Sequence, residues 1–184
     1  YLPEIPPLYT NETPEEYLKF VAEAKGLKGK EMDRRIEGVI SQTRIQNVRI
    51  RLISKLSKGY RQRVGIAQAL LGNPKVIILD EPTVGLDPIQ IIEIRDLIKQ
   101  LGKNHTVILS SHILSEVQAI CEKVLIISGG KLIAFDEPEH LEKSLPGSNE
   151  ILFTTEATRE EVEEVKSLLG EITEVSYRET QDGL

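Results

Sequence analysis

The sequence predicts an α/β fold in which a parallel sheet with flanking helices follows a helical first third. Three short runs rich in β-branched residues predict the strands, namely Val76–Leu79, Thr106–Ser110 and Val124–Ser128. Amphipathic segments separate these runs, as is typical of the crossover helices of parallel sheets. The chain has 184 residues, 40% of them apolar, and is therefore long enough to bury a core without disulfides or a metal.

Two amphipathic segments predict the helices of the first third. Thr13, Pro14 and Glu16 match the N-cap, the first and the third helical positions of a capping box. The stretch Lys25–Lys30 contains two glycines and ends this helix. The apolar stripe of the first helix is Tyr17, Leu18, Val21 and Ala24, and that of the second is Met32, Ile36, Val39 and Ile40.

Capping residues predict a further helix between the first two strands. Asp87 is its N-cap, Pro88 is its first residue, and Gly102 lies just past its end. Two glycines then separate the apolar runs Val124–Ser128 and Lys131–Phe135, and they predict a hairpin turn with positive φ. The apolar stripe of the helix is Ile91, Ile94, Ile98 and Leu101.

Composition and charge argue against several classes of protein. Cys121 is the single cysteine, which rules out a disulfide framework and a cysteine-based zinc site. The chain carries 23 Lys and Arg against 29 Asp and Glu, and this acidic balance argues against a nucleic-acid surface. No apolar run approaches the roughly 20 residues that cross a bilayer. Because residue 1 is tyrosine rather than methionine, we expect the chain to begin inside a longer protein.

We expect three regions along the chain. Residues 1–75 form a helical part, residues 76–145 carry the parallel strands, and residues 146–184 form a small α+β appendage. A composition break at Pro146–Ser148 marks the start of the appendage, in which we predict a strand, a helix and a return strand. The predicted helix of the appendage is rich in glutamate, which we interpret as a solvated face rather than a metal site.

The first predicted strand ends abruptly in two carboxylates, Asp80 and Glu81. In an open parallel sheet, ligands gather beyond the carboxyl ends of the strands, so these two acids are expected to face a crevice. Asp80 could hold Mg²⁺, and Glu81 could position or polarise a water. A buried strand that simply meets a polar turn explains the same residues, and on this segment alone the two interpretations are equally good.

Other polar residues occur at the ends of predicted elements. Ser57 and Gly59 open a helix and offer a hydroxyl and free amides to an anion, although an ordinary serine cap explains them as well. For this segment alone we favour the cap, and capping also explains Asp87 and Pro88. His112 follows the second predicted strand, where its imidazole could bind a phosphate oxygen or a water, although a lone histidine in a loop is most often simply solvated.

Taken in order, these segments resemble the motifs of the nucleotide-binding domain of ATP-binding cassette (ABC) transporters. The resemblance covers about residues 1–145, and it is greatest for the exporter branch with multidrug, sodium and gliding-type systems. The similar motifs are the signature motif at Leu56–Gln62, the Walker B strand at Val76–Asp80, the catalytic glutamate at Glu81, the D-loop at Gly85–Asp87 and the switch histidine at His112.

Three departures from the family pattern qualify the resemblance. Glu4 stands where many members place the Q-loop glutamine, and a carboxylate donates no hydrogen bond unless it is protonated. Lys58 and Tyr60 replace a glycine and a glutamine of the commoner signature, while Ser57 and Gly59 are kept. The sequence contains no G-x-x-x-x-G-K-[ST] phosphate loop, which in the family precedes the Q-loop. We therefore expect an N-terminally truncated P-loop NTPase-type fold, inactive as a fragment.

The resemblance implies an ATP-hydrolysing subunit that works as a head-to-tail dimer, with an identical or a different second nucleotide-binding domain. It implies export through a separate membrane permease, at the cytoplasmic face of the membrane, without nucleic acid as a partner. Asp80 would hold Mg²⁺, Glu81 would be the general base or position the water, and His112 would stabilise the transferring phosphoryl group. The other implied site residues are Ser57, Gly59 and Tyr60 at the partner's ATP, Asp87 between the two sites, and Glu4 at the entrance to the helical part.

Three alternatives stay open on the sequence alone. A soluble ABC-type ATPase acting on DNA or the ribosome would carry the same motifs, but it should add a coiled-coil insertion or a second cassette. A non-catalytic regulatory module derived from the cassette would have no chemical need for Asp80, Glu81 and His112 together. A purely structural domain explains each motif singly but not their joint order. For the appendage, we expect a regulatory or dimer-supporting role.

Overall fold

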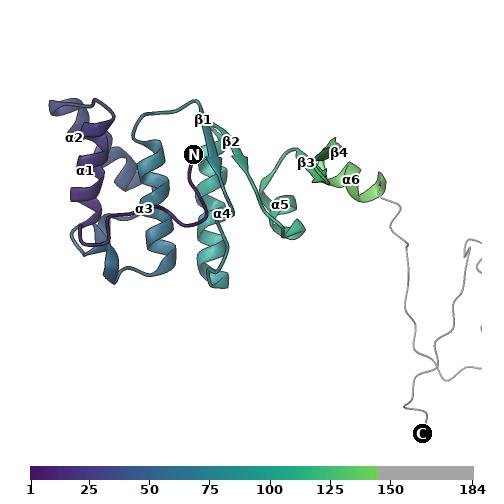
Figure 1. Ribbon diagram of the computed structural model, residues 1–184, viewed down its shortest axis with the longest axis horizontal. Coiled ribbons are helices and arrows are strands. Elements are labelled where there is room, and N and C mark those ends of the chain that lie inside the picture. Colours follow the sequence, from purple (N-terminus) through teal and green to yellow (C-terminus); the bar gives the residue numbers. More distant parts are fainter. Residues whose placement is uncertain (145–184) are drawn as a thin grey trace, which may run out of the picture. The chain divides into compact units, whose positions relative to one another are not determined.

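The computed structural model describes residues 1–144, which lie within the unit Tyr1–Leu145 (Figure 1). The appendage predicted for residues 146–184 lies outside the described residues. The helices are α1 Pro14–Ala24, α2 Gly29–Gln42, α3 Lys58–Leu70, α4 Pro88–Gly102, α5 Leu114–Ile120 and α6 Pro138–Ser144, with 3₁₀ turns at Gln46–Val48 and Ile53–Lys55. The strands are β1 Val76–Leu79, β2 Thr106–Leu109, β3 Val124–Ser128 and β4 Lys131–Asp136.

The first three helices pack together, as the apolar stripes predict. The capping box at the start of α1 is confirmed, because the Thr13 hydroxyl accepts from the Glu16 amide and the Glu16 carboxylate accepts from the Thr13 amide. The prediction for one member of the α1 apolar stripe was wrong, because Ala24 is exposed whereas Ala22 is fully buried. Ala22 lies one turn after Leu18 on the buried face, whereas Ala24 is the last residue of the helix.

The parallel sheet has two strands among residues 1–144. Strand β1 pairs in parallel with β2, from Val76 opposite Thr106 to Leu79 opposite Leu109. On its other side, β1 is bridged by the N-terminal segment, where the Leu2 amide donates to the Ile78 carbonyl at 2.8 Å. Alternate side chains of β1 are buried in one core cluster with the apolar face of α4, which lies beside the strand pair (Figure 1). The buried members of α4 are Ile94, Leu97, Ile98 and Leu101.

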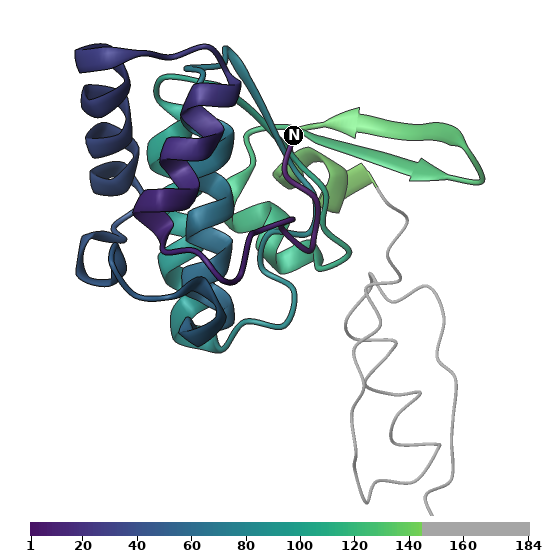
Figure 2. The same cartoon turned by 60° about the vertical axis from the view of Figure 1, so that its left-hand side comes forward.

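The third predicted strand forms as β3, but it does not join the parallel sheet among the described residues. Instead, β3 pairs antiparallel with β4 in a two-stranded ribbon, visible in Figure 2. The predicted hairpin turn is confirmed, with φ of 56° at Gly129 and 74° at Gly130. A turn this short brings β4 directly beside β3, whereas pairing of β3 with the parallel strands would be a long-range contact that the local pattern does not determine. No helix in residues 1–144 combines the length and the apolar character that a membrane crossing requires.

Candidate functional site

The register of the parallel strands brings the first polar residues after β1 and β2 together. Because Leu79 lies opposite Leu109, Asp80 comes beside Ser110. The Ser110 hydroxyl donates to Asp80 Oδ1 at 2.7 Å, and the Tyr1 hydroxyl donates to Oδ2 at 2.9 Å. The bond from Ser110, followed by the bond from Tyr1, lowers the pKa of Asp80. Asp80 is thus a half-buried carboxylate that its neighbours keep ionised.

Glu81 is held in an uncommon backbone conformation beside His112. Its φ of 44° lies in the left-handed region, which costs a non-glycine residue energy and persists only where the surroundings enforce it. The Glu81 amide is held by the Ser110 hydroxyl at 3.0 Å, and Glu81 Oε1 accepts from His112 Nδ1 at 2.9 Å. The other oxygen, Oε2, is buried and has no hydrogen-bond partner among the described residues. The bond to Glu81 raises the pKa of His112.

The residues of the signature segment form a second group at the start of α3. Ser57 is the N-cap, and its hydroxyl accepts from the Tyr60 amide at 3.3 Å, so the serine-cap interpretation is confirmed. A Cβ on Gly59 would lie 2.6 Å from Oε1 of Gln90, so this glycine permits a close approach between α3 and α4. The Tyr60 hydroxyl accepts from Asn47 at 2.8 Å.

Asp87 belongs to this second group through α4. Its carboxylate accepts from the Gln90 amide at 2.9 Å, which confirms the predicted N-cap. Because Gln90 also lies against Gly59, the starts of α3 and α4 are neighbours. The Lys58 side chain contacts Gly85, which has φ of 68°, and so joins the signature segment to the turn before Asp87.

The predicted site residues therefore fall into two groups. The β1-end group contains Asp80, Glu81 and His112, and the exposed Glu4 is near enough for its charge to contribute to the raised pKa of His112. The α3-start group contains Ser57, Gly59, Tyr60 and Asp87. Within residues 1–144, no hydrogen bond or ion pair joins the two groups.

Sequence reasoning assigned no role to Tyr1 or to the Ser110 side chain. A signal for Ser110 was present, because in parallel strands of equal length the residues after the two ends are neighbours. No comparable signal identifies Tyr1, which reaches Asp80 because the N-terminal segment pairs beside β1.

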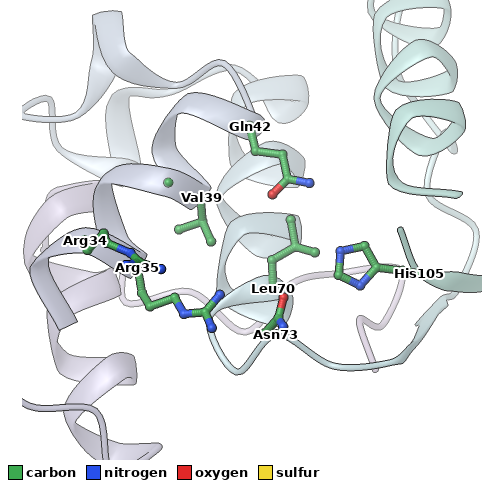
Figure 3. Close-up of a pocket in the computed structure, with 8 residues that line it drawn as sticks. Arg34, Arg35, Val39, Gln42, Leu70, Asn73 and His105 are labelled. Atoms are coloured by element: carbon green, nitrogen blue, oxygen red, sulfur yellow. The ribbon is translucent and has the colours of Figure 1, made fainter. Parts of the chain in front are cut away.

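Two cavities of the described part are lined by residues outside the β1-end group. One cavity of about 290 Å³ lies between α2, the end of α3 and the loop before β2 (Figure 3). It is basic, since Arg34, Arg35 and His105 contribute to its lining, but it includes no predicted site residue. A second cavity of about 350 Å³ includes Tyr60 of the α3-start group.

The oxygen ligands of the β1-end group suit a Mg²⁺ ion that protein, water and substrate phosphates hold together, rather than one enclosed by protein side chains alone. Residues 1–144 contain no cluster of three or more His, Cys, Asp or Glu side chains that would enclose a metal. Mg²⁺ is commonly held by one or two carboxylates together with waters and substrate phosphates. An ionised Asp80 with the Ser110 hydroxyl beside it suits that arrangement.

Comparisons with known proteins find similarity to ATP-binding proteins of ABC transporters. The family model described as ABC transporter matches residues 1–84. The bacitracin transport ATP-binding protein BcrA of Bacillus licheniformis is 44% identical over 76% of this chain and 45% of its own length. The lantibiotic transport ATP-binding protein SrtF of Streptococcus pyogenes is 38% identical over 82% of this chain and 65% of its own length.

A solved structure extends the comparison to the fold. The structure of cbiO1 from Clostridium perfringens, part of the ABC transporter complex cbiONQ, matches with a TM-score of 0.70 and 30% identity, over 75% of this chain and 55% of that chain. The fold is thus the α/β, P-loop NTPase type that the sequence predicts. The chain is thus similar to ABC transporter ATP-binding proteins in sequence and in fold. It spans about half the length of the relatives that it matches.

Proposed function

We propose that the complete protein containing this chain is the ATP-hydrolysing subunit of an ABC exporter. It acts at the cytoplasmic face of the membrane, as a dimer bound to a separate permease, with ATP and Mg²⁺. The observation that supports this best is the β1-end group, in which Glu81 lies 2.9 Å from His112 and directly follows Asp80. The names of BcrA and SrtF, which refer to bacitracin and lantibiotic transport, support a transport role.

Asp80 would bind the Mg²⁺ ion, and Ser110 orients Asp80 and Glu81. The two hydroxyls on Asp80 keep its carboxylate ionised, and the carboxylate can then hold Mg²⁺. When bound, Mg²⁺ neutralises charge on the phosphate oxygens. Ser110 also fixes the Glu81 amide, so one hydroxyl orients both acids.

Glu81 and His112 carry the proton and charge chemistry. His112 Nδ1 donates to Glu81 Oε1 and so orients the carboxylate that would position the attacking water. In the neutral ring Nε2 would then be an acceptor, whereas in the imidazolium it is a donor. The raised pKa of His112 favours the imidazolium, so Nε2–H is available to stabilise negative charge on the transferring phosphoryl group.

The separation of the two groups supports the head-to-tail arrangement. The α3-start group offers the start of a helix, whose dipole favours a phosphate, but it makes no polar contact with the β1-end group within residues 1–144. Two copies that face each other in opposite directions would place the Ser57 group of one against the Glu81 group of the other. Asp87 then lies between the two sites, and the helical residues 1–75, with Glu4 at their entrance, contact the permease.

The variant Glu81→Gln in the complete protein tests the catalytic assignment. We expect ATP hydrolysis to be abolished while ATP still binds, because glutamine keeps the shape of the side chain but loses the basic oxygen. Phosphate release and equilibrium ATP binding measure the two effects separately. Near-normal hydrolysis by this variant, with contaminating ATPases excluded, would refute the role of Glu81.

The chain by itself is expected not to hydrolyse ATP. Its sequence has no phosphate loop, and the lysine and amides of that loop supply most phosphate binding. Titration of the 184-residue chain with a fluorescent ATP analogue tests this expectation. Micromolar binding would show that the nucleotide contacts have been assigned wrongly.

A further inference from the structure

A buried carboxylate, Glu116, links three elements behind the β1-end group. Glu116 lies in the first turn of α5, and its side chain is 4% exposed. One oxygen accepts a hydrogen bond from the buried hydroxyl of Thr83, and the other lies 3.3 Å from the Arg95 guanidinium of α4. A buried charge is costly unless it is paired, and here both oxygens have a partner.

The contact between Thr83 and Glu116 joins the two segments that carry Glu81 and His112. Thr83 lies in the turn that carries Glu81, and Glu116 follows His112 at the start of the next helix. The turn after β1 and the segment after β2 are therefore joined twice, by Glu81 to His112 at the surface and by Thr83 to Glu116 in the interior. The left-handed φ of Glu81 is a conformation that needs such external support.

We propose that Glu116, through its bond to Thr83, is a positioning residue that fixes Glu81 and His112 in the geometry for phosphoryl transfer. The proposal rests on the proposed function. Glu116 touches neither nucleotide nor water in this role; it acts through the turn. Arg95 makes one contact at 3.3 Å, and its buried Nε has no partner among the described residues, so the Thr83 bond is the contact to test.

The competing explanation is that the Thr83 contact only stabilises the fold. A second buried threonine, Thr43, serves as the control that distinguishes a positioning role from a structural one. Thr43 is fully buried, and its hydroxyl donates to the Val39 carbonyl at 2.7 Å, in the helical part away from the β1-end group. Thr83→Val and Thr43→Val thus make the same chemical change at two buried sites. Thr83→Ser keeps the hydroxyl and is the rescue variant.

In the complete protein, we expect Thr83→Val to lower kcat at least about tenfold with little change in KM for ATP, because small displacements of catalytic groups are costly. Thr83→Ser should keep most of the activity, and Thr43→Val should keep kcat even where it lowers stability. The proposal is overturned if Thr83→Val keeps its kcat, or if Thr83→Ser loses as much. Thr83→Ala replaces Thr83→Val if the valine variant does not fold.

Hydrogen exchange on the 184-residue chain supplies a readout that needs no ATPase activity. The Glu81 amide donates to Ser110 and the Val84 amide donates to the Glu81 carbonyl, so both report on the turn. We expect both to exchange faster in Thr83→Val and to be unchanged in Thr43→Val. Unchanged exchange in Thr83→Val overturns the proposal. If exchange is faster in Thr83→Val but the complete wild-type protein does not hydrolyse ATP, the proposed function is refuted and the link through Glu116 stands.

Discussion

His112 Nδ1 lies 2.9 Å from Glu81 Oε1, and this pair spans the ends of two neighbouring strands. The contact raises the pKa of His112 above its ordinary value of 6.5. Because the folded-state pKa is the higher one, the pair's contribution to stability is complete below about pH 6.5 and is lost as the pH rises through the folded-state pKa.

Histidine ring titration by NMR measures this shift directly. The chain has three histidines, so His105 and His140 are observed in the same spectrum as His112. We expect Glu81→Gln to lower the pKa of His112 and to leave the other two curves unchanged, because the hydrogen bond to the Glu81 carboxylate, followed by its charge, raises this pKa. Titration of wild-type His112 at or below 6.5 would contradict the pair.

Two glycines in helices should respond to alanine with opposite signs. A Cβ on Gly65 would lie 2.9 Å from Leu2 and from Pro6, so Gly65→Ala should cost about 1–3 kcal/mol through overpacking. Gly38 in α2 has open space around its Cα, so Gly38→Ala should stabilise by up to about 1 kcal/mol through helix propensity. Chemical denaturation of both variants measures the difference. Equal effects would show that the N-terminal segment does not pack against α3.

The N-cap of α4 should contribute measurably to stability. Asp87→Ala leaves the Gln90 amide without its partner and should cost about 1 kcal/mol, whereas Asp87→Asn should cost much less. Asp96 is exposed in the middle of the same helix, so Asp96→Ala is the matched control, with little effect on the free energy of unfolding. A cost from Asp96→Ala as large as that from Asp87→Ala would remove the cap as the explanation.

The sequence predicted helices and caps better than it predicted strand partners. Asp87, Thr13 and Ser57 cap their helices as expected, because a cap is set by residues within one turn of it. The hairpin of β3 with β4 was predicted from its two-residue turn, whereas the expected place of β3 in the parallel sheet was wrong for residues 1–144, since that pairing depends on segments distant in sequence.

Within the site, motif order predicted the residues but not their contacts. The motifs pointed to Asp80, Glu81 and His112, but nothing in their pattern indicated that Tyr1 also reaches Asp80. The contact between Thr83 and Glu116 was not predicted either, because a buried polar contact leaves no periodic signal in the sequence.

Mixing two inactive variants of the complete protein tests most directly the claim that each ATP site is shared between two subunits. Glu81→Gln disables the β1-end group, and Ser57→Arg blocks the α3-start group. In a head-to-tail pair, each ATP site combines the Glu81 group of one subunit with the Ser57 group of the other. A mixed dimer therefore has both substitutions in one site and neither in the second site. Random mixing should therefore restore about a quarter of the wild-type sites. ATPase activity that stays absent on mixing, although mixed dimers form, would contradict the account.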